Sequence, residues 1–220
     1  MIILKKNFPF RKKLGKVRRK LFKTNAAYWY YKCLKKEENI RPPILEEHIT
    51  FSTSYYSEVV QWILKHRNEY PWIYNVKELE SALRNGHYFP CLISGGQIAG
   101  FVKVGFKRVY IEDYEREIDL SKEEAFIYDT FILPQHRRKY LGSYLLFELF
   151  KDLMQKGIAV AYCHIPTWNV ASSRLYLKVG FKRLAYVRYL RFLQFYHFSH
   201  RLEDIRKHAR KEAEKFVMAF

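Results

Sequence analysis

The segment between residues 125 and 165 constrains the fold more than any other part of the chain. Residues 125–133 and 158–165 are apolar and predict strands, and residues 140–156 between them predict a helix. Leucines recur at every fourth position of that helix, and Gly157 follows it as a stop signal. Since a strand, a helix and a strand in this order pair in parallel with a right-handed crossover, we expect two adjacent parallel strands.

The segments on either side of this unit predict a mixed sheet, so the expected fold class is α/β (α+β, mixed sheet). Further strands are expected at residues 26–34, 48–53 and 181–198, with a hairpin at residues 88–93 and 98–108, helices at residues 59–66, 76–85 and 169–180, and a loop at residues 113–122. The doublet Pro42-Pro43 forces extended backbone and indicates a linker. We therefore divide the chain into a basic, aromatic extension (1–43), a domain (44–198) and an amphipathic C-terminal helix (199–220).

Charge is distributed unevenly along the chain. The net charge is +18, and residues 1–36 contribute 13 Lys and Arg without a single Asp or Glu. Leu14, Val17 and Leu21 recur at helical spacing within this basic arm. Three interpretations fit the arm: a helix at an anionic membrane surface, a segment that binds RNA or another polyanion, and a solvated arm.

The cysteines and the apolar runs indicate a location. Cys33, Cys91 and Cys163 are widely separated and form no CxxC pair, so neither a disulfide framework nor a zinc site is expected. No apolar run reaches the length of a membrane-spanning helix, and the first residues lack the apolar core of a signal peptide. We expect a cytoplasmic protein, peripheral at the inner membrane surface if the basic arm binds lipid. The helix at residues 201–220 is expected to pack on its own domain or on the twin subunit of a homodimer.

The turn that precedes the central helix is suited to bind an anion. The first N–H groups of a helix have no intrahelical acceptor, and the helix dipole adds about half a positive charge there. Arg137, Arg138 and Lys139 stand at this turn. They predict a pyrophosphate site that needs no metal. The alternative is an ordinary solvated helix start with basic residues.

A second motif makes the first more specific. The segment from Asn169 to Phe181 contains Asn169, Ala171, Leu175, Tyr176, Gly180 and Phe181. With the loop Arg137-Arg138-Lys139-Tyr140-Leu141-Gly142, it resembles the GNAT superfamily of acyl-CoA-dependent N-acetyltransferases, whose loop reads Arg/Gln-x-x-Gly-x-Gly/Ala. The resemblance covers about residues 46–190. Tyr140 replaces the first loop glycine, so we expect it in helical geometry within the first turn, with its ring turned away from the phosphates.

The resemblance implies a binding site for acetyl-CoA, with no metal. In the family the pantetheine arm lies between two parallel strands that splay apart. Here the main chain of Phe131, Ile132 and Leu133 would hold the arm, and N–H groups near residues 129–131 would polarise the thioester carbonyl. The other residues expected to bind the coenzyme are Arg137, Arg138, Lys139, Tyr140, Leu141, Gly142, Ser143, Asn169 and Ser172.

The resemblance also implies a general acid, and the chemistry requires a base. The family's acid corresponds to Tyr176, which would protonate the leaving CoA thiolate; the alternative is a packing tyrosine. An alkylamine is mostly ammonium at neutral pH, so a base is needed. Asp129, His164 and Glu124 are the candidates. The alternative for Asp129 is a carboxylate hydrogen-bonded to a neighbouring loop, and the alternative for His164 is a core histidine with satisfied hydrogen bonds.

These observations predict an N-acetyltransferase that moves an acetyl group from acetyl-CoA to an amine by direct attack. One alternative uses a longer acyl-CoA or acyl carrier protein at a membrane surface. Another is a non-catalytic polyanion-binding protein on the same fold. The acidic segment between residues 112 and 119 is interpreted as a solvated loop, or else as a site that attracts a cationic acceptor.

Overall fold

The computed structural model describes residues 22–34, 43–45, 48–192, 195–198, 206–207 and 211. The strands are β1 (Phe22–Cys33), β2 (Ile49–Ser52), β3 (Cys91–Ser94), β4 (Gln97–Gly105), β5 (Arg108–Ile111), β6 (Arg116–Asp119), β7 (Glu124–Ile132), β8 (Val160–Pro166), β9 (Lys182–Phe192) and β10 (Phe195–Phe198). The α-helices are α2 (Tyr56–His66), α3 (Val76–Asn85), α4 (Leu141–Gln155) and α5 (Val170–Lys178), and short 3-10 turns are η1 (Pro71–Ile73), η2 (Glu112–Tyr114) and η3 (Pro134–His136).

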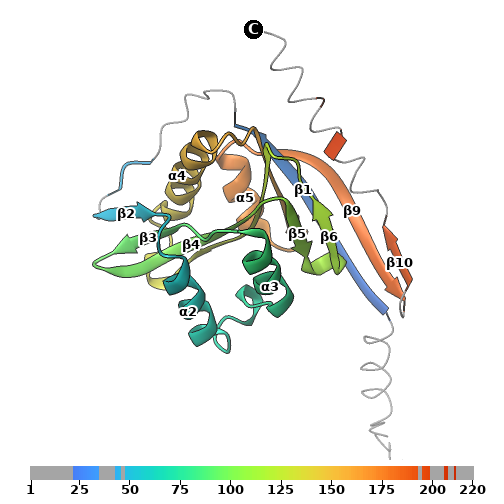
Figure 1. Cartoon of the computed structure of the whole chain (residues 1–220), viewed down its shortest axis with the longest axis horizontal. Coiled ribbons are helices and arrows are strands. Elements are labelled where there is room, and N and C mark those ends of the chain that lie inside the picture. The colour runs from blue at the N-terminus through green and yellow to red at the C-terminus, as the bar shows by residue number, and fades with distance from the viewer. Residues whose placement is uncertain are drawn as a thin grey trace, which may run out of the picture.

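Eight strands form one mixed sheet in the order β10-β9-β1-β8-β7-β4-β3-β2 (Figure 1). Its one parallel pair is β7 with β8, joined through α4, as the strand–helix–strand pattern predicts. The expected α/β class with a mixed sheet is confirmed. The predictions for the basic arm at residues 1–21 and for almost all of the C-terminal helix fall outside the described residues.

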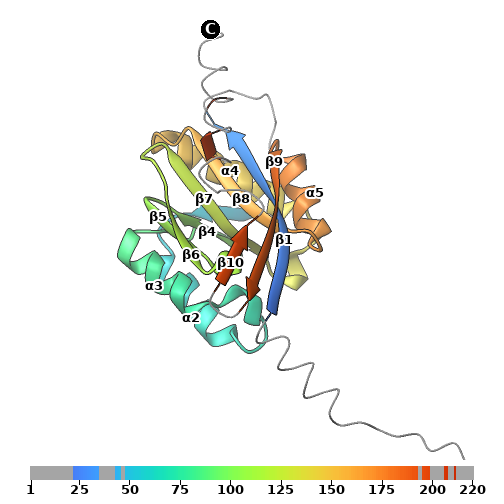
Figure 2. The same ribbon diagram turned by 90° about the vertical axis from the view of Figure 1, so that its right-hand side faces the viewer.

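The sheet is covered on both faces. On one face α4 and α5 pack their apolar sides against the strands, in a cluster that includes Leu145, Leu149 and Tyr176. On the other face lie α2, α3 and the small sheet β5–β6 (Figures 1 and 2). Two further clusters fill that side, one around Trp29 and one around Phe101. The central strands are therefore buried on both sides, which explains their continuous apolar runs.

Strand β1 has a position that the sequence does not reveal. It lies between β9 and β8 and pairs with both in antiparallel fashion, with Tyr30 opposite Cys163 and Tyr28 opposite Tyr186. Trp29 and Tyr30 are completely buried. Strand β1, which the sequence analysis assigns to the N-terminal extension, is thus an inner strand of the sheet. The division of the chain at residues 43 and 44 remains a prediction.

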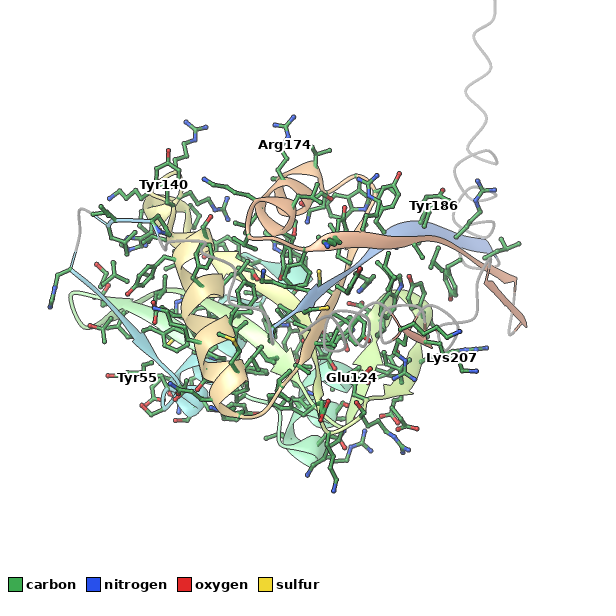
Figure 3. All side chains as sticks on the ribbon, turned by 90° about the horizontal axis from the view of Figure 1, so that it is seen from above. Tyr55, Glu124, Tyr140, Arg174, Tyr186 and Lys207 are labelled. Carbon is green, nitrogen blue, oxygen red and sulfur yellow. The ribbon has the colours of Figure 1, made fainter. Side chains whose placement is uncertain are left out.

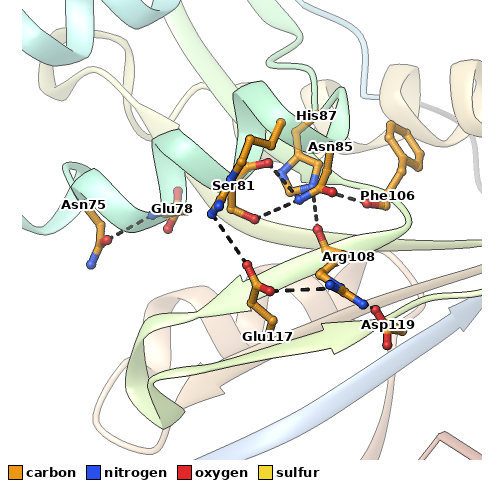
Figure 4. Close-up of polar contacts among 10 residues, drawn as sticks. Asn75, Glu78, Ser81, Asn85, His87, Phe106, Arg108, Glu117 and Asp119 are labelled. Carbon is orange, nitrogen blue, oxygen red and sulfur yellow. Dashed lines mark hydrogen bonds and ion pairs between the residues drawn. The ribbon is translucent and has the colours of Figure 1, made fainter.

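The polar segment after β5 is a strand rather than the loop expected from its composition. Residues Arg116–Asp119 form β6 and pair with β5, with Arg108 opposite Asp119. Arg108 Nε lies 2.6 Å from Asp119 Oδ1, and Glu117 reaches both Arg108 and Arg84 of α3 (Figure 4). With Ile118 as its single apolar residue, this four-residue segment has no periodic pattern that would distinguish an exposed strand from a loop.

Candidate active site

The two parallel strands separate along their length. β7 and β8 pair only at Glu124–Phe126 with Val160–Tyr162. Within the described ranges, β7 is paired beyond that point only with β4 on its other side, whereas β8 is paired only with β1. Because the strands diverge after Phe126 and Tyr162, the facing backbone edges of residues 127–132 and 163–166 have no ladder partner among the described residues. A gap of this kind accepts an extended chain that pairs as an additional strand.

A β-bulge interrupts β7 beside this gap. Val102 and Val104 of β4 oppose Thr130 and Ile127, so the single residue Lys103 faces two residues of β7. The extra residue lies at positions 128–129. It reverses the alternation of side chains, so that Ile127 and Thr130 point to the same face although they are three positions apart. That face is the one covered by α4 and α5.

The bulge brings Thr130 to Tyr176. The two hydroxyl oxygens lie 2.8 Å apart. Tyr176 extends from α5 and is only 2% exposed, with its ring edge-on to Phe181 at 4.9 Å between centroids. Burial raises the pKa of the Tyr176 phenol above its usual value, so the group is protonated at neutral pH. Burial likewise raises the pKa of the neighbouring Cys163 thiol, which is therefore neutral and a poor nucleophile.

Asp129 belongs to a buried charge cluster. Lys103 Nζ lies 2.7 Å from Asp129 Oδ2, 2.5 Å from Glu78 Oε1 and 3.0 Å from the carbonyl oxygen of Ile73. Burial alone would lower the pKa of Lys103, but the two carboxylates raise it. Burial also raises the pKa of Glu78, to about 7. Asp129 is the more accessible carboxylate, with 35% of its side chain exposed. The Asp129 carboxylate in this apolar strand thus forms an ion pair with Lys103.

The other two candidate bases lie elsewhere. The His164 ring packs against the rings of Trp29, Tyr114 and Phe126, on the side of β8 opposite Cys163. Glu124 is buried at the beginning of β7, before the strands separate, and its carboxylate accepts hydrogen bonds from the Tyr162 hydroxyl and the Ser121 N–H.

The basic turn has the expected open helix end. The first intrahelical hydrogen bond runs from the Tyr144 N–H to the Tyr140 carbonyl, and the Tyr140 side chain caps nothing. The N–H groups of residues 141–143 consequently point outward, as an anion site requires. Gly142 keeps this end compact, since an added Cβ would lie 3.2 Å from Leu175 of α5.

The expectation for the Tyr140 backbone is wrong. Tyr140 is the N-cap residue with φ 60° and ψ 7°, in the left-handed region, and Arg138 also has a positive φ of 64°. Tyr140 therefore keeps the conformation that a glycine would adopt, at a cost of about 1–2 kcal/mol. Its ring is 60% exposed at the surface (Figure 3) and lies 4.5 Å from the Lys178 ammonium.

The remaining predicted binding residues have mixed surroundings. Arg137 turns back to the end of β7, where its Nε donates to the Ile132 carbonyl and its guanidinium lies over Phe131. Arg138 and Lys139 are exposed, and Ser143 is buried. The Leu133 N–H donates to Ala99, so it is not available to a pantetheine arm. At the start of α5, the Asn169 side chain accepts a hydrogen bond from the Ser172 N–H, which is an ordinary helix cap.

Sequence reasoning missed two residues of this site, Thr130 and Lys103. Lys103 carries a signal, because a lysine inside the apolar run Phe101–Gly105 requires a carboxylate partner when it is buried. Thr130 carries none. Its orientation depends on the bulge, and no pattern in the sequence marks the bulge.

Comparison with known proteins agrees with this geometry. The model of the acetyltransferase (GNAT) family matches residues 46–181, which is more than half of the chain. The chain belongs to the GNAT family. The match begins after β1 and ends just before β9, so the strands that complete the GNAT sheet beyond β8 lie outside it. No curated protein sequence matches the chain.

Solved structures share the GNAT fold at low sequence identity. A Drosophila protein has a TM-score of 0.54 at 12% identity, over 86% of this chain and 58% of its own. A tandem GNAT protein from the clavulanic acid biosynthesis pathway has a TM-score of 0.53 at 16% identity, over 85% of this chain and 59% of its own. A functionally unknown conserved protein from Staphylococcus epidermidis has a TM-score of 0.53 at 10% identity, over 87% and 69%. The chain thus spans less than two thirds of the first two.

Members of the GNAT family transfer an acyl group from acyl-CoA to an acceptor, and two features of this chain suit such a donor. The separated strands present backbone edges of the kind that pair with pantetheine, and the open end of α4 presents N–H groups of the kind that bind pyrophosphate. In the described part of the chain, no three His, Cys, Asp or Glu side chains gather as a metal site. None of the described helices is long and apolar enough to cross a membrane.

Proposed function

We propose that this protein is an N-acetyltransferase that moves the acetyl group of acetyl-CoA to an amine by direct attack. The observation that carries the proposal is the Tyr176 phenol, held by Thr130 on the strand that borders the gap between β7 and β8. A thioester arm lying in that gap would bring its sulfur towards a protonated hydroxyl group. A tyrosine that only packs in the core would not need to lie beside unpaired backbone edges of this kind.

The donor would bind at two places. Main-chain groups of Ile132 would pair with the pantetheine after Arg137 releases the Ile132 carbonyl, because those of Phe131 and Leu133 face β4 in the ladder. The N–H groups of residues 141–143, together with Arg138 and Lys139, would bind the pyrophosphate. Arg137 is then free to turn towards the same phosphates. Asn169 and Ser172 would act from the start of α5, as the helix cap that faces this end of the site.

The transfer would need a base and an acid but no covalent enzyme intermediate. Asp129 is the proposed base, because it is the partly exposed carboxylate next to the bulge, where a bulge N–H would polarise the thioester carbonyl. Tyr176 is the proposed acid. The neutral thiol of Cys163 argues against an acyl-cysteine intermediate, since a thiolate is the reactive form.

Isothermal titration with CoA and acetyl-CoA tests the donor site. The double variant Arg138→Ala/Lys139→Ala should bind both at least about tenfold more weakly, because charge-assisted hydrogen bonds to phosphate are lost. The matched control is Lys151→Ala/Lys156→Ala, which removes the same charge at the other end of α4 and should bind normally. Absence of binding to the wild-type protein, or equal losses in both variants, contradicts the proposal.

Turnover with donors of different chain length tests the acetyl group. We expect kcat/KM for acetyl-CoA to exceed that for octanoyl-CoA when free thiol is followed in the presence of a panel of amines. A preference for octanoyl-CoA would instead favour a longer acyl donor on the same fold.

A further inference from the structure

The hydroxyl groups of Thr130 and Tyr176 form a pair whose direction matters. Their oxygens are 2.8 Å apart, and either can be the donor. If Tyr176 donates to Thr130, its proton is not available to a substrate. If Thr130 donates to Tyr176, the phenol keeps its own proton for another acceptor. The two arrangements differ only in the rotation of two hydroxyl groups.

We propose that Thr130 is a positioning residue that donates its hydroxyl proton to the Tyr176 oxygen and so directs the phenol proton at the leaving sulfur of the donor. The inference rests on the proposed function and adds a residue to it. Thr130 stands on β7 at the edge of the gap, and Tyr176 approaches from α5, so the pair spans the two elements that enclose the thioester.

Three features of the structure support this role. The bulge at residues 128–129 places Thr130 on the face of α5, whereas regular alternation from Ile127 would direct it away. Tyr176 is nearly completely buried against Phe181, so its phenol has little freedom to find another orientation. Finally, burial raises the pKa of Tyr176 and makes it a weaker acid, while the hydrogen bond from Thr130 acts in the opposite direction.

The step balances without any further reactant. A neutral amine adds to the thioester carbonyl after one proton has left the ammonium for Asp129. As the tetrahedral intermediate collapses, the C–S bond breaks, its electron pair goes to sulfur, and the Tyr176 proton moves to sulfur. The resulting tyrosinate accepts the hydrogen bond of Thr130 and regains a proton from the second N–H of the former amine through solvent. The products are the amide, CoA thiol and the proton on Asp129.

The experiment compares four proteins: Thr130→Val, Thr130→Ser, Tyr176→Phe and the double variant Thr130→Val/Tyr176→Phe. Valine has the shape of threonine without the hydroxyl, and serine keeps the hydroxyl. Acetyl-CoA is the donor, the acceptor is the alkylamine of the panel that the wild-type protein turns over fastest, and the released thiol is measured, with circular dichroism melts to establish that each protein is folded. We expect Thr130→Val to lower kcat about tenfold with an unchanged KM for acetyl-CoA, and Thr130→Ser to restore kcat to within about threefold.

The double variant separates positioning from a structural effect. If Thr130 acts through Tyr176, Thr130→Val should change kcat by less than about twofold once Tyr176 is Phe. The inference is overturned if Thr130→Val lowers kcat in the Tyr176→Phe background as much as it does in the wild-type protein. It is also overturned if Thr130→Val turns over at the wild-type rate while Tyr176→Phe is slow. If the wild-type protein binds acetyl-CoA but releases no thiol, the proposed function fails together with the inference. If Tyr176→Phe turns over normally, Tyr176 is not the acid and Thr130 has no role through it, so the inference is overturned while the proposed acetyltransferase function stands.

Discussion

At the scale of single residues, Lys103 shows how one buried charge organises its surroundings. Its ammonium group has three acceptors on three different segments: Glu78 of α3, Ile73 of η1 and Asp129 of β7. The lysine therefore connects the helical layer to the bulge beside the gap. The ion pair of Asp129 with Lys103 also lies at the place where we propose that an amine approaches.

Replacing Lys103 by Met should destabilise the protein by about 3–5 kcal/mol, because two carboxylates lose their counter-ion in a buried place. Urea denaturation measures the loss. The control is Lys151→Met, which breaks an exposed pair with Glu148 and should cost less than about 1 kcal/mol. Adding Glu78→Gln to Lys103→Met should recover part of the loss. Equal costs for the two lysine variants would contradict this account of the cluster.

At the scale of elements, the end of α3 is linked to the small sheet by His87. Asn75 caps the beginning of α3, and Gly86 ends it in the left-handed conformation (Figure 4). The next residue, His87, is buried, and its Nε2 lies 2.9 Å from the Arg108 carbonyl and 3.3 Å from that of Phe106. A neutral ring with its proton on Nε2 satisfies both carbonyl groups.

This linkage should depend on pH. Burial lowers the pKa of His87 below its usual value, although the two carbonyl groups act to raise it. The unfolded chain then binds more protons than the folded one below about pH 6.5, so His87 should reduce stability as the pH falls through that range. The raised pKa of Glu78 has the opposite effect on stability, because it favours the folded state as the pH falls, and it is present in both proteins compared. Unfolding free energies of wild type and His87→Gln, measured from pH 7.5 to 5, should converge as the pH falls; parallel curves would refute the role of His87.

Elements with a strong period or a clear stop signal were predictable, and those defined by their neighbours were not. Helix α4 follows directly from its leucine spacing and Gly157, and α3 from Asn75 and Gly86. Strand β6 was missed because its stability comes from pairing with β5. In the candidate site, Tyr176 could be located by its motif, whereas Thr130 could not, because its direction depends on a register shift against β4.

At the scale of the whole molecule, β1 decides whether the sheet is continuous. Its side chains Trp29, Tyr30 and Tyr31 are buried, and its backbone joins β8 to β9. A protein without residues 1–43 should therefore fail to fold, with aggregation or loss of cooperative melting. A protein without residues 1–20 is the control and should melt cooperatively, because it retains β1. A shortened protein 44–220 that melts cooperatively would contradict the importance of β1 and support the division at residue 43.

The place of β1 also sets the order in which the protein can mature. The strand leaves the ribosome before its two partners, β8 and β9, which lie far later in the chain. Until then Tyr30 lacks its backbone partner on β8 and the Ser173 hydroxyl, and the Trp29 ring lacks its contact with His164. Pairings between such distant segments form slowly and leave apolar surface open to wrong contacts. For this chain the joining of β1 to the sheet is therefore a step that must wait for the synthesis of β8 and β9.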